Sequence, residues 1–316
     1  MRNELTDEAL EYGTLVARAV EAAGGDALAA AAEDDPSRRR DLVWPVLSEL
    51  GAWELEPLTS ADEAEAAAAL CRAAGRWALP FPVAAHLSRP AEVDAEGAFV
   101  VAGARPAAPL DGLGGRWVGV TLDGDVADIR ARPADRPARK SAFVVELELE
   151  PTGLRAAPAE VALAVALPCW SLLGMLDRAV EMTRGYVIER QQFGQPLSRF
   201  QSVQFQLTDA EVERLGVEEL AKYSLWSIEA GRADALDDAL ALRLAAVEAA
   251  EVVFRICHQL HGAIGFCDET PLSWLSRSSQ PLRRLPTNPA ATRAELGSRI
   301  EGRGLAGLYT PEEARR

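Results

Sequence analysis

Two segments in the second half of the chain carry residues that could bind a phosphate-bearing ligand. The first runs from Tyr186 to Gln201, and it places Arg190 at the end of an expected helix, just before a Gly194–Pro196 turn. An arginine in that position can complement the helix macrodipole. It can also grip a phosphate, since the guanidinium group binds phosphate oxygens in a bidentate way. The residue types alone leave both roles open.

The second segment runs from Gln259 to Leu272 and contains Gly262 and Gly265 directly after another expected helix. Two glycines so close together let the backbone approach a ligand, with Gln259 and His261 available to hydrogen-bond it. The alternative is an ordinary helix C-cap followed by a loop.

Other site chemistries are not supported by the sequence. The three histidines make a metal site improbable, and Cys257 and His258, being adjacent, diverge by about 100° on a helix. The Gly112-x-Gly114 pair has Trp117 at the third glycine position of a dinucleotide loop, so strand turns explain it. No CxxC pair occurs, so the cysteines are expected to be buried thiols in a reducing compartment: Cys71, Cys169, Cys257 and Cys267.

Composition restricts the partners and the compartment. The 316 residues carry a net charge of −15, which disfavours nucleic acid and anionic membranes as partners. The N-terminus has no apolar signal region, and the longest apolar run, 161–176, falls short of the roughly 20 residues of a membrane span. We therefore expect a cytoplasmic protein.

The elements that must position these segments follow a helix–strand–helix order. Residues 1–92 have helical patterns, including a start at Ser60 with Glu63 three residues later. Residues 93–155 contain short β-like runs separated by Gly, Pro and Asp, which predicts a small β domain. Residues 156–316 predict long antiparallel helices, from about 160 to 190, 201 to 228 and 233 to 260. The expected fold class is mainly α with a small middle β domain.

The two segments, in their order and spacing, resemble the acyl-CoA dehydrogenase family. The first matches the family pattern through Arg190-x-x-Phe193-Gly194 and Phe200-Gln201. The second matches a Gln-x-x-Gly-Gly-x-Gly loop followed by a Glu-x-Pro-Leu helix start, with Ala263 in place of the second glycine. The resemblance covers about 159–277, and it implies an N-terminal helical domain, a middle β domain and a C-terminal four-helix bundle.

The resemblance also implies a cofactor and a reaction. Family members remove the α-hydrogen of an acyl-CoA thioester with a glutamate base, while the β-hydrogen passes as hydride to FAD. The flavin ring served by these segments lies in a neighbouring subunit. The FAD contacts implied for this chain are Arg190, Gln192, Phe193, Phe200, Gln201, Gln259, His261, Gly262 and Ala263.

The catalytic half of the family site is missing from this sequence. The region that usually carries the base in a Glu-Gly-Thr stretch, 282–293, contains no such stretch. The minority position on the first bundle helix corresponds to Ala164, which cannot take a proton. Glu160, one turn earlier on the same face, is the sole rescue candidate, but the sequence favours its role as an acid in the first turn of the helix, where the dipole stabilises it. The β segment is short and lacks the family's flavin-holding stretches.

Three hypotheses follow. The first is the non-catalytic subunit of an α2β2 acyl-CoA dehydrogenase, with a catalytic partner subunit and one FAD per heterodimer. By analogy, such an assembly would act on bulky steroid side-chain CoA thioesters and pass electrons to an electron-transfer flavoprotein-like acceptor. The second is a homotetrameric dehydrogenase using Glu160. The third is a flavin-free scaffold. The apolar cover around the helix at 170–176 suggests burial against further helices, including those of a partner.

Overall fold

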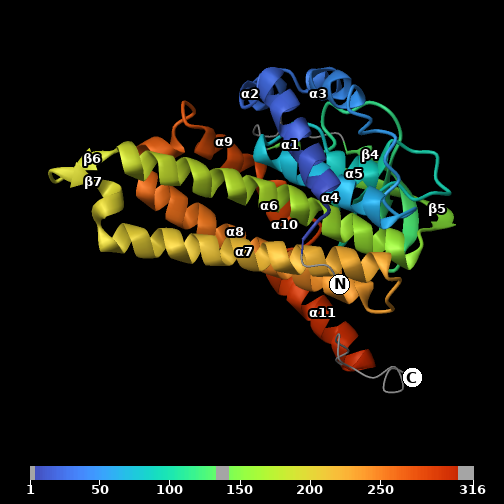
Figure 1. Ribbon diagram of the computed structural model, residues 1–316. Coiled ribbons are helices and arrows are strands. Elements are labelled where there is room, and N and C mark those ends of the chain that lie inside the picture. The colour runs from blue at the N-terminus through green and yellow to red at the C-terminus, as the bar shows by residue number, and fades with distance from the viewer. Residues whose placement is uncertain (1–3, 133–141, 305–316) are drawn as a thin grey trace.

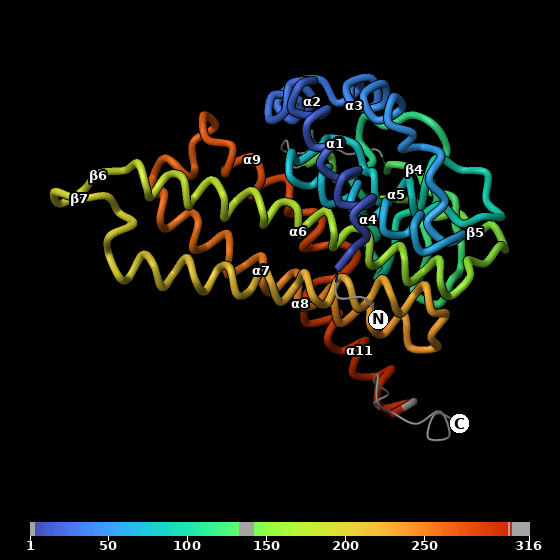
Figure 2. Tube along the Cα trace, viewed as in Figure 1, coloured from blue at the N-terminus to red at the C-terminus, as the bar shows by residue number. Residues whose placement is uncertain are grey.

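The computed structural model describes residues 4–132 and 142–304 and consists of two helical parts around a small sheet (Figure 1). The N-terminal helices pack on one side of the long bundle helices, near the sheet, as the chain trace also shows (Figure 2). Ser60 caps one of the two 16-residue helices of the first part, α4, because its side chain accepts a hydrogen bond from the Glu63 amide at 3.2 Å. The first helices are α1 (Asp7–Ala22), α2 (Ala27–Asp34), η1 (Pro36–Arg38), α3 (Arg39–Ser48), α4 (Ala61–Arg76) and α5 (Val83–Leu87).

The middle sheet has five strands in the order β1-β3-β4-β5-β2. β1 and β3 are parallel, and the other pairs are antiparallel. β3 is buried along its whole length, whereas β5 is largely exposed and shows no regular alternation of buried and exposed residues. The strands are β1 (Gly97–Val100), β2 (Ala107–Ala108), β3 (Trp117–Val120), β4 (Asp125–Ala131) and β5 (Val145–Arg155).

The bundle is built from three long helices, each running opposite to the one before it (Figure 1). Shorter helices follow them and complete the C-terminal part. This arrangement confirms the predicted fold class. The elements are α6 (Pro158–Glu189), β6 (Gln191–Gln192), β7 (Gln195–Pro196), η2 (Leu197–Arg199), α7 (Gln201–Glu229), α8 (Ala235–His261), η3 (Gly262–Phe266), α9 (Pro271–Ser278), α10 (Gln280–Arg284) and α11 (Pro289–Arg303).

The helix α6 is the central core helix of the molecule. By length and composition it could cross a membrane, but 78% of its most apolar window is buried inside this chain. Trp170, Leu172 and Leu173 point to different sides of the helix, and all three are buried by other elements of the same chain, among them α4, α7 and α8. The sequence-based expectation that this apolar cover points to a partner is therefore wrong, because intramolecular packing accounts for it.

The N-terminal part and the bundle meet where α4 crosses α6 with backbones in direct contact. A Cβ atom added at Gly75 would lie 1.8 Å from the Ser171 carbonyl oxygen. One added at Gly174 would lie 1.9 Å from the Arg72 carbonyl oxygen. Both distances are far below van der Waals contact, so the crossing requires glycine on each helix.

Gly174→Ala should therefore lower the thermal unfolding midpoint of the protein. A methyl group there must push two backbones apart, and overpacking of this kind typically costs about 1–3 kcal/mol. Gly185→Ala is the matched control on the same helix, because a Cβ there meets nothing within 4 Å. That variant should gain up to about 1 kcal/mol from helix propensity. Equal midpoints for the two variants would contradict the close crossing.

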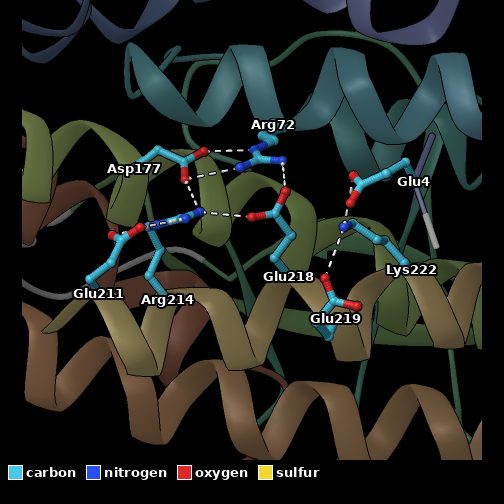
Figure 3. Close-up of polar contacts among 8 residues, drawn as sticks. All are labelled: Glu4, Arg72, Asp177, Glu211, Arg214, Glu218, Glu219 and Lys222. Atoms are coloured by element: carbon cyan, nitrogen blue, oxygen red, sulfur yellow. Dashed lines mark hydrogen bonds and ion pairs between the residues drawn. The ribbon is translucent and has the colours of Figure 1, made fainter. Parts of the chain in front are cut away.

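An ion-pair network links α4 and α6 to each other and to α7 (Figure 3). Arg72 of α4 donates to Asp177 of α6 at 2.6 and 3.1 Å and to Glu218 of α7 at 2.7 Å, and Arg214 of α7 bonds both carboxylates at 3.0 and 2.9 Å. Burial alone would raise the pKa of Glu218, but the two guanidinium groups outweigh it and hold that pKa below its usual value. With its carboxylates ionised, the network therefore holds the N-terminal helices against the bundle.

Candidate functional site

The first predicted segment forms a hairpin at one end of the bundle (Figure 1). α6 ends at Glu189 because Arg190 takes an extended backbone conformation. The chain then pairs β6 with β7 and returns through η2 into α7. The Leu197 amide donates to the Arg190 carbonyl at 2.9 Å and closes this turn. The Arg190 side chain is left exposed at the helix end.

The tip of the hairpin is strained and exposed. Phe193 has φ = 54° and the following Gly194 has φ = 79°, as in the two-residue turns that favour Asn-Gly or Gly-Gly. A phenylalanine in the left-handed region is a backbone outlier that costs on the order of 1–3 kcal/mol. Its ring is 89% exposed and meets Phe200 edge to face at 6.1 Å. An exposed aromatic ring, held in place by a strained backbone, is suited to contact a molecule outside this chain.

The second predicted segment ends α8 beside the first one. The His261 ring stacks on Tyr186 of α6, with centroids 4.5 Å apart. Its Nδ1–H donates to the Cys257 carbonyl at 2.9 Å, and burial lowers the pKa of this histidine. His261 is thus a neutral side chain that ties α8 to α6. Gly262 turns the chain at φ = 65°.

The bundle end therefore brings most of the predicted FAD contacts together as an exposed surface. The packing of His261 on Tyr186 joins the segment at 186–201 to the segment at 259–272. Arg190, Gln192, Phe193, Gln201, Gln259, Gly262 and Ala263 are exposed, Phe200 is half-buried and His261 is buried. One guanidinium group and several amides can donate hydrogen bonds to a diphosphate, and the exposed Phe193 ring can pack against an aromatic group. The residues present therefore fit FAD.

Glu160 is engaged as a helix cap. Its Oε2 accepts the Ala157 amide at 2.6 Å and its Oε1 accepts the Ala91 amide at 2.7 Å. The carboxylate thereby closes the first turn of α6 and ties it to the chain after α5. Both oxygens are occupied by main-chain donors, which favours the capping role over the base.

The two positions where the family carries its catalytic base, both without an acid in this chain, contribute to the wall of one cavity. A cavity of about 170 Å³ lies between α4, the sheet, α6 and the α9–α10 region, and Ala164 forms part of its wall. From the region where the family carries its base, Leu282, Leu285 and Pro286 line it. Glu33, from α2, is the one carboxylate in this lining, within the described ranges. The positions that match the family's two base positions thus offer the cavity no acid.

The cavity also contains two residues that sequence reasoning missed, Arg39 and Arg243. Arg243 stands in the middle of the Leu- and Ala-rich stretch 239–247, and a charged residue there was the available signal. Arg39 lies within a run of three arginines, so nothing in the sequence distinguished it from Arg38 and Arg40.

One further expectation was partly wrong. Cys71, Cys169 and Cys257 are buried as expected, but Cys267 is exposed, because η3 carries it out of the bundle end.

The outer face of α7 is apolar and acidic. Its exposed apolar residues, 38–61% accessible, are Phe205, Val212, Leu215 and Leu220. Asp209 and Glu213 stand exposed between them, and neither makes an ion pair within 4–132 and 142–304. The two basic residues of α7 are turned away, since Arg214 is held in the network and Lys222 bonds Glu4 and Glu219 (Figure 3).

Comparison with known proteins finds a match for the C-terminal part. Residues 152–285 match the family described as "Acyl-CoA dehydrogenase, C-terminal domain". Acyl-CoA dehydrogenase FadE28 of Mycobacterium tuberculosis is 33% identical over 126 residues, which are 40% of this chain and 37% of that protein. The alignment thus spans about a third of this relative's length.

Two solved structures share the fold over nearly the whole chain. The ChsE4-ChsE5 complex from Mycobacterium tuberculosis superposes with a TM-score of 0.76 at 17% identity, over 97% of this chain and 100% of that one. The Tcur3481-Tcur3483 steroid ACAD also gives 0.76, at 20% identity, over 95% of this chain and 99% of that one. At these identities the likeness shows the fold.

Proposed function

We propose that the protein is the non-catalytic subunit of a heteromeric, FAD-dependent acyl-CoA dehydrogenase. The match of residues 152–285 to the C-terminal domain of that family supports this proposal. It contributes the exposed bundle end to FAD, while a partner subunit supplies the catalytic glutamate. The observation that carries this proposal is the contrast between the two halves of the site. The residues assigned to FAD are mostly exposed at the bundle end, whereas Ala164 and the stretch after α10 present no base to the cavity.

In this assignment each group of the chain has a limited task. Arg190 and Gln259 hold the diphosphate part of FAD, and Phe193 covers an aromatic part. FAD, when bound, supplies the hydride acceptor for the β-hydrogen of the thioester. Proton removal from the α-carbon falls to the partner, since Glu160 is used as a cap. The complete homotetramer and the flavin-free scaffold are less well supported.

The substrate and the acceptor follow by analogy. The structural neighbours include a protein described as a steroid ACAD, which supports a bulky acyl-CoA as the substrate of the assembly. An electron-transfer flavoprotein-like acceptor and a cytoplasmic location complete the proposal.

The outer face of α7 supports a partner that differs from this chain. Two copies packed through this face would bring Asp209 and Glu213 near their own equivalents, and like charges in an interface cost several kcal/mol by order of magnitude. A partner with apolar and basic residues on the matching face avoids that cost. The net charge of −15 also disfavours the pairing of two identical chains.

Val212→Glu should therefore abolish assembly with the partner. The side chain is 61% exposed, so the folded chain should change by less than about 0.5 kcal/mol in stability. Light scattering of the co-expressed chains should show the assembly for the wild type and separated subunits for the variant. Leu10→Glu, at an exposed leucine of α1, is the matched control and should assemble normally. Normal assembly of Val212→Glu would remove α7 from the interface.

A further inference from the structure

Arg243 is a buried cation in the wall of the cavity. It lies in the middle of α8, is 4% exposed, and donates to the Leu282 and Thr287 carbonyl oxygens at 3.0 Å each. Its Nε–H has no hydrogen-bond partner among the residues that the structure describes. Both of its bonds go to neutral main-chain groups, so its charge is not balanced by an acid.

Arg39 lines the same cavity, but the Asp111 carboxylate partly offsets its charge and the Phe143 ring centroid lies 4.0 Å from its guanidinium carbon. It is 2% exposed and donates to the carbonyl oxygens of Pro80 and Pro109 at 2.6 and 3.0 Å, and to that of Asp111. Burial lowers the pKa of Arg39 to about 9 and also lowers the pKa of Arg243. Neither arginine forms a salt bridge with any side chain in the described ranges.

The net charge of the cavity wall is therefore opposite in sign to the net charge of the whole chain. Two guanidinium groups against the single carboxylate of Glu33 give the lining a net charge of +1, in a chain whose net charge is −15. The rest of the wall is mainly apolar, with residues such as Val165, Met175 and Leu282. Buried charges are normally paired, because an unpaired ion loses its hydration without return.

We propose that this cavity binds a carboxylate with an apolar body, whose carboxylate group meets Arg243 and whose body lies against the apolar wall. A single net positive charge fits a monoanion, and the small number of polar groups in the wall disfavours a phosphate dianion. This site is separate from the exposed bundle end, and the proposal does not depend on the assignment of the FAD contacts.

The test uses decanoate and decanol as probes, which share the apolar body and differ in charge. Isothermal titration of the full chain in its purified assembly should show decanoate binding about 10- to 100-fold more tightly than decanol, as a charge-assisted hydrogen bond of about 1.5–3 kcal/mol predicts. Arg243→Gln should remove this difference by weakening decanoate alone. Arg283→Gln, at a half-buried arginine of α10 outside the lining, should leave both affinities unchanged.

A second variant locates the site. Ala164→Leu extends a side chain from the wall and should weaken both probes, while circular dichroism shows the helices intact. Equal affinity for the two probes, or no binding of either, would overturn the proposal. So would Arg243→Gln weakening both probes equally, because Arg243 would then serve only to hold the chain at 282–287. Unchanged binding by a folded Ala164→Leu variant would place the ligand elsewhere and contradict the proposal as well.

Discussion

Arg190→Ala is expected to lower the affinity of the assembly for FAD about 10- to 100-fold while the helices stay folded, since the loss of one charge-assisted bond costs about 1.5–3 kcal/mol. The folded chain should tolerate the change. The Arg190 side chain is exposed and makes no hydrogen bond or ion pair with any residue in the described ranges. Its remaining structural role is a helix-end cation, worth about 0.3–1 kcal/mol.

Flavin absorbance of the co-purified assembly, titrated with FAD, measures this effect. Arg184→Ala is the matched control, because Arg184 is also an exposed arginine of α6 but lies before the helix end. It should keep full FAD affinity. If both variants retain the wild-type affinity, Arg190 is only a helix-end cation and the assigned phosphate contact is wrong.

The purified chain without its partner is expected to dehydrogenate no acyl-CoA. Removing an α-proton from a thioester near neutral pH needs a positioned base, which typically contributes roughly 10²–10⁴-fold to the rate. Here the matching position on α6 is Ala164, and the carboxylate of Glu160 is bonded to two main-chain amides.

Glu160→Gln separates the two roles of this residue. In the assembly with the catalytic partner, turnover should stay within a few-fold of the wild type. The thermal midpoint should fall slightly, because glutamine keeps one acceptor oxygen for the two amides and loses the charge that suits the first turn of a helix. A drop of 100-fold or more with an unchanged midpoint would make Glu160 the base and revive the homotetrameric hypothesis.

The sequence predicted the long helices, and the presence of short strands between the two helical parts, because their signals are local. Ser60 begins α4 with its own side chain, and Arg190 leaves the helical conformation just before the Phe193–Gly194 turn. Both predicted segments lie at one bundle end, because antiparallel helices return the chain to the same place.

The rest depended on contacts between distant parts of the chain. The apolar cover of Trp170 and its neighbours indicated burial but not by which chain, and the structure shows that it is the same chain. Likewise, the pattern around Arg243 did not show that Arg39, two hundred residues earlier, shares its cavity. The strain at Phe193 is a backbone property that residue types alone do not reveal.

The FAD content and the mass of the purified assembly test the central claim most directly. If this chain contributes only an FAD-binding half-site, co-expression with its catalytic partner should give a complex of two copies of each chain holding one FAD per heterodimer, and the chain alone should hold none. A homo-oligomer of this 33.9 kDa chain that carries one FAD per subunit would contradict the account, as would a stable, flavin-free monomer that does not associate with the partner.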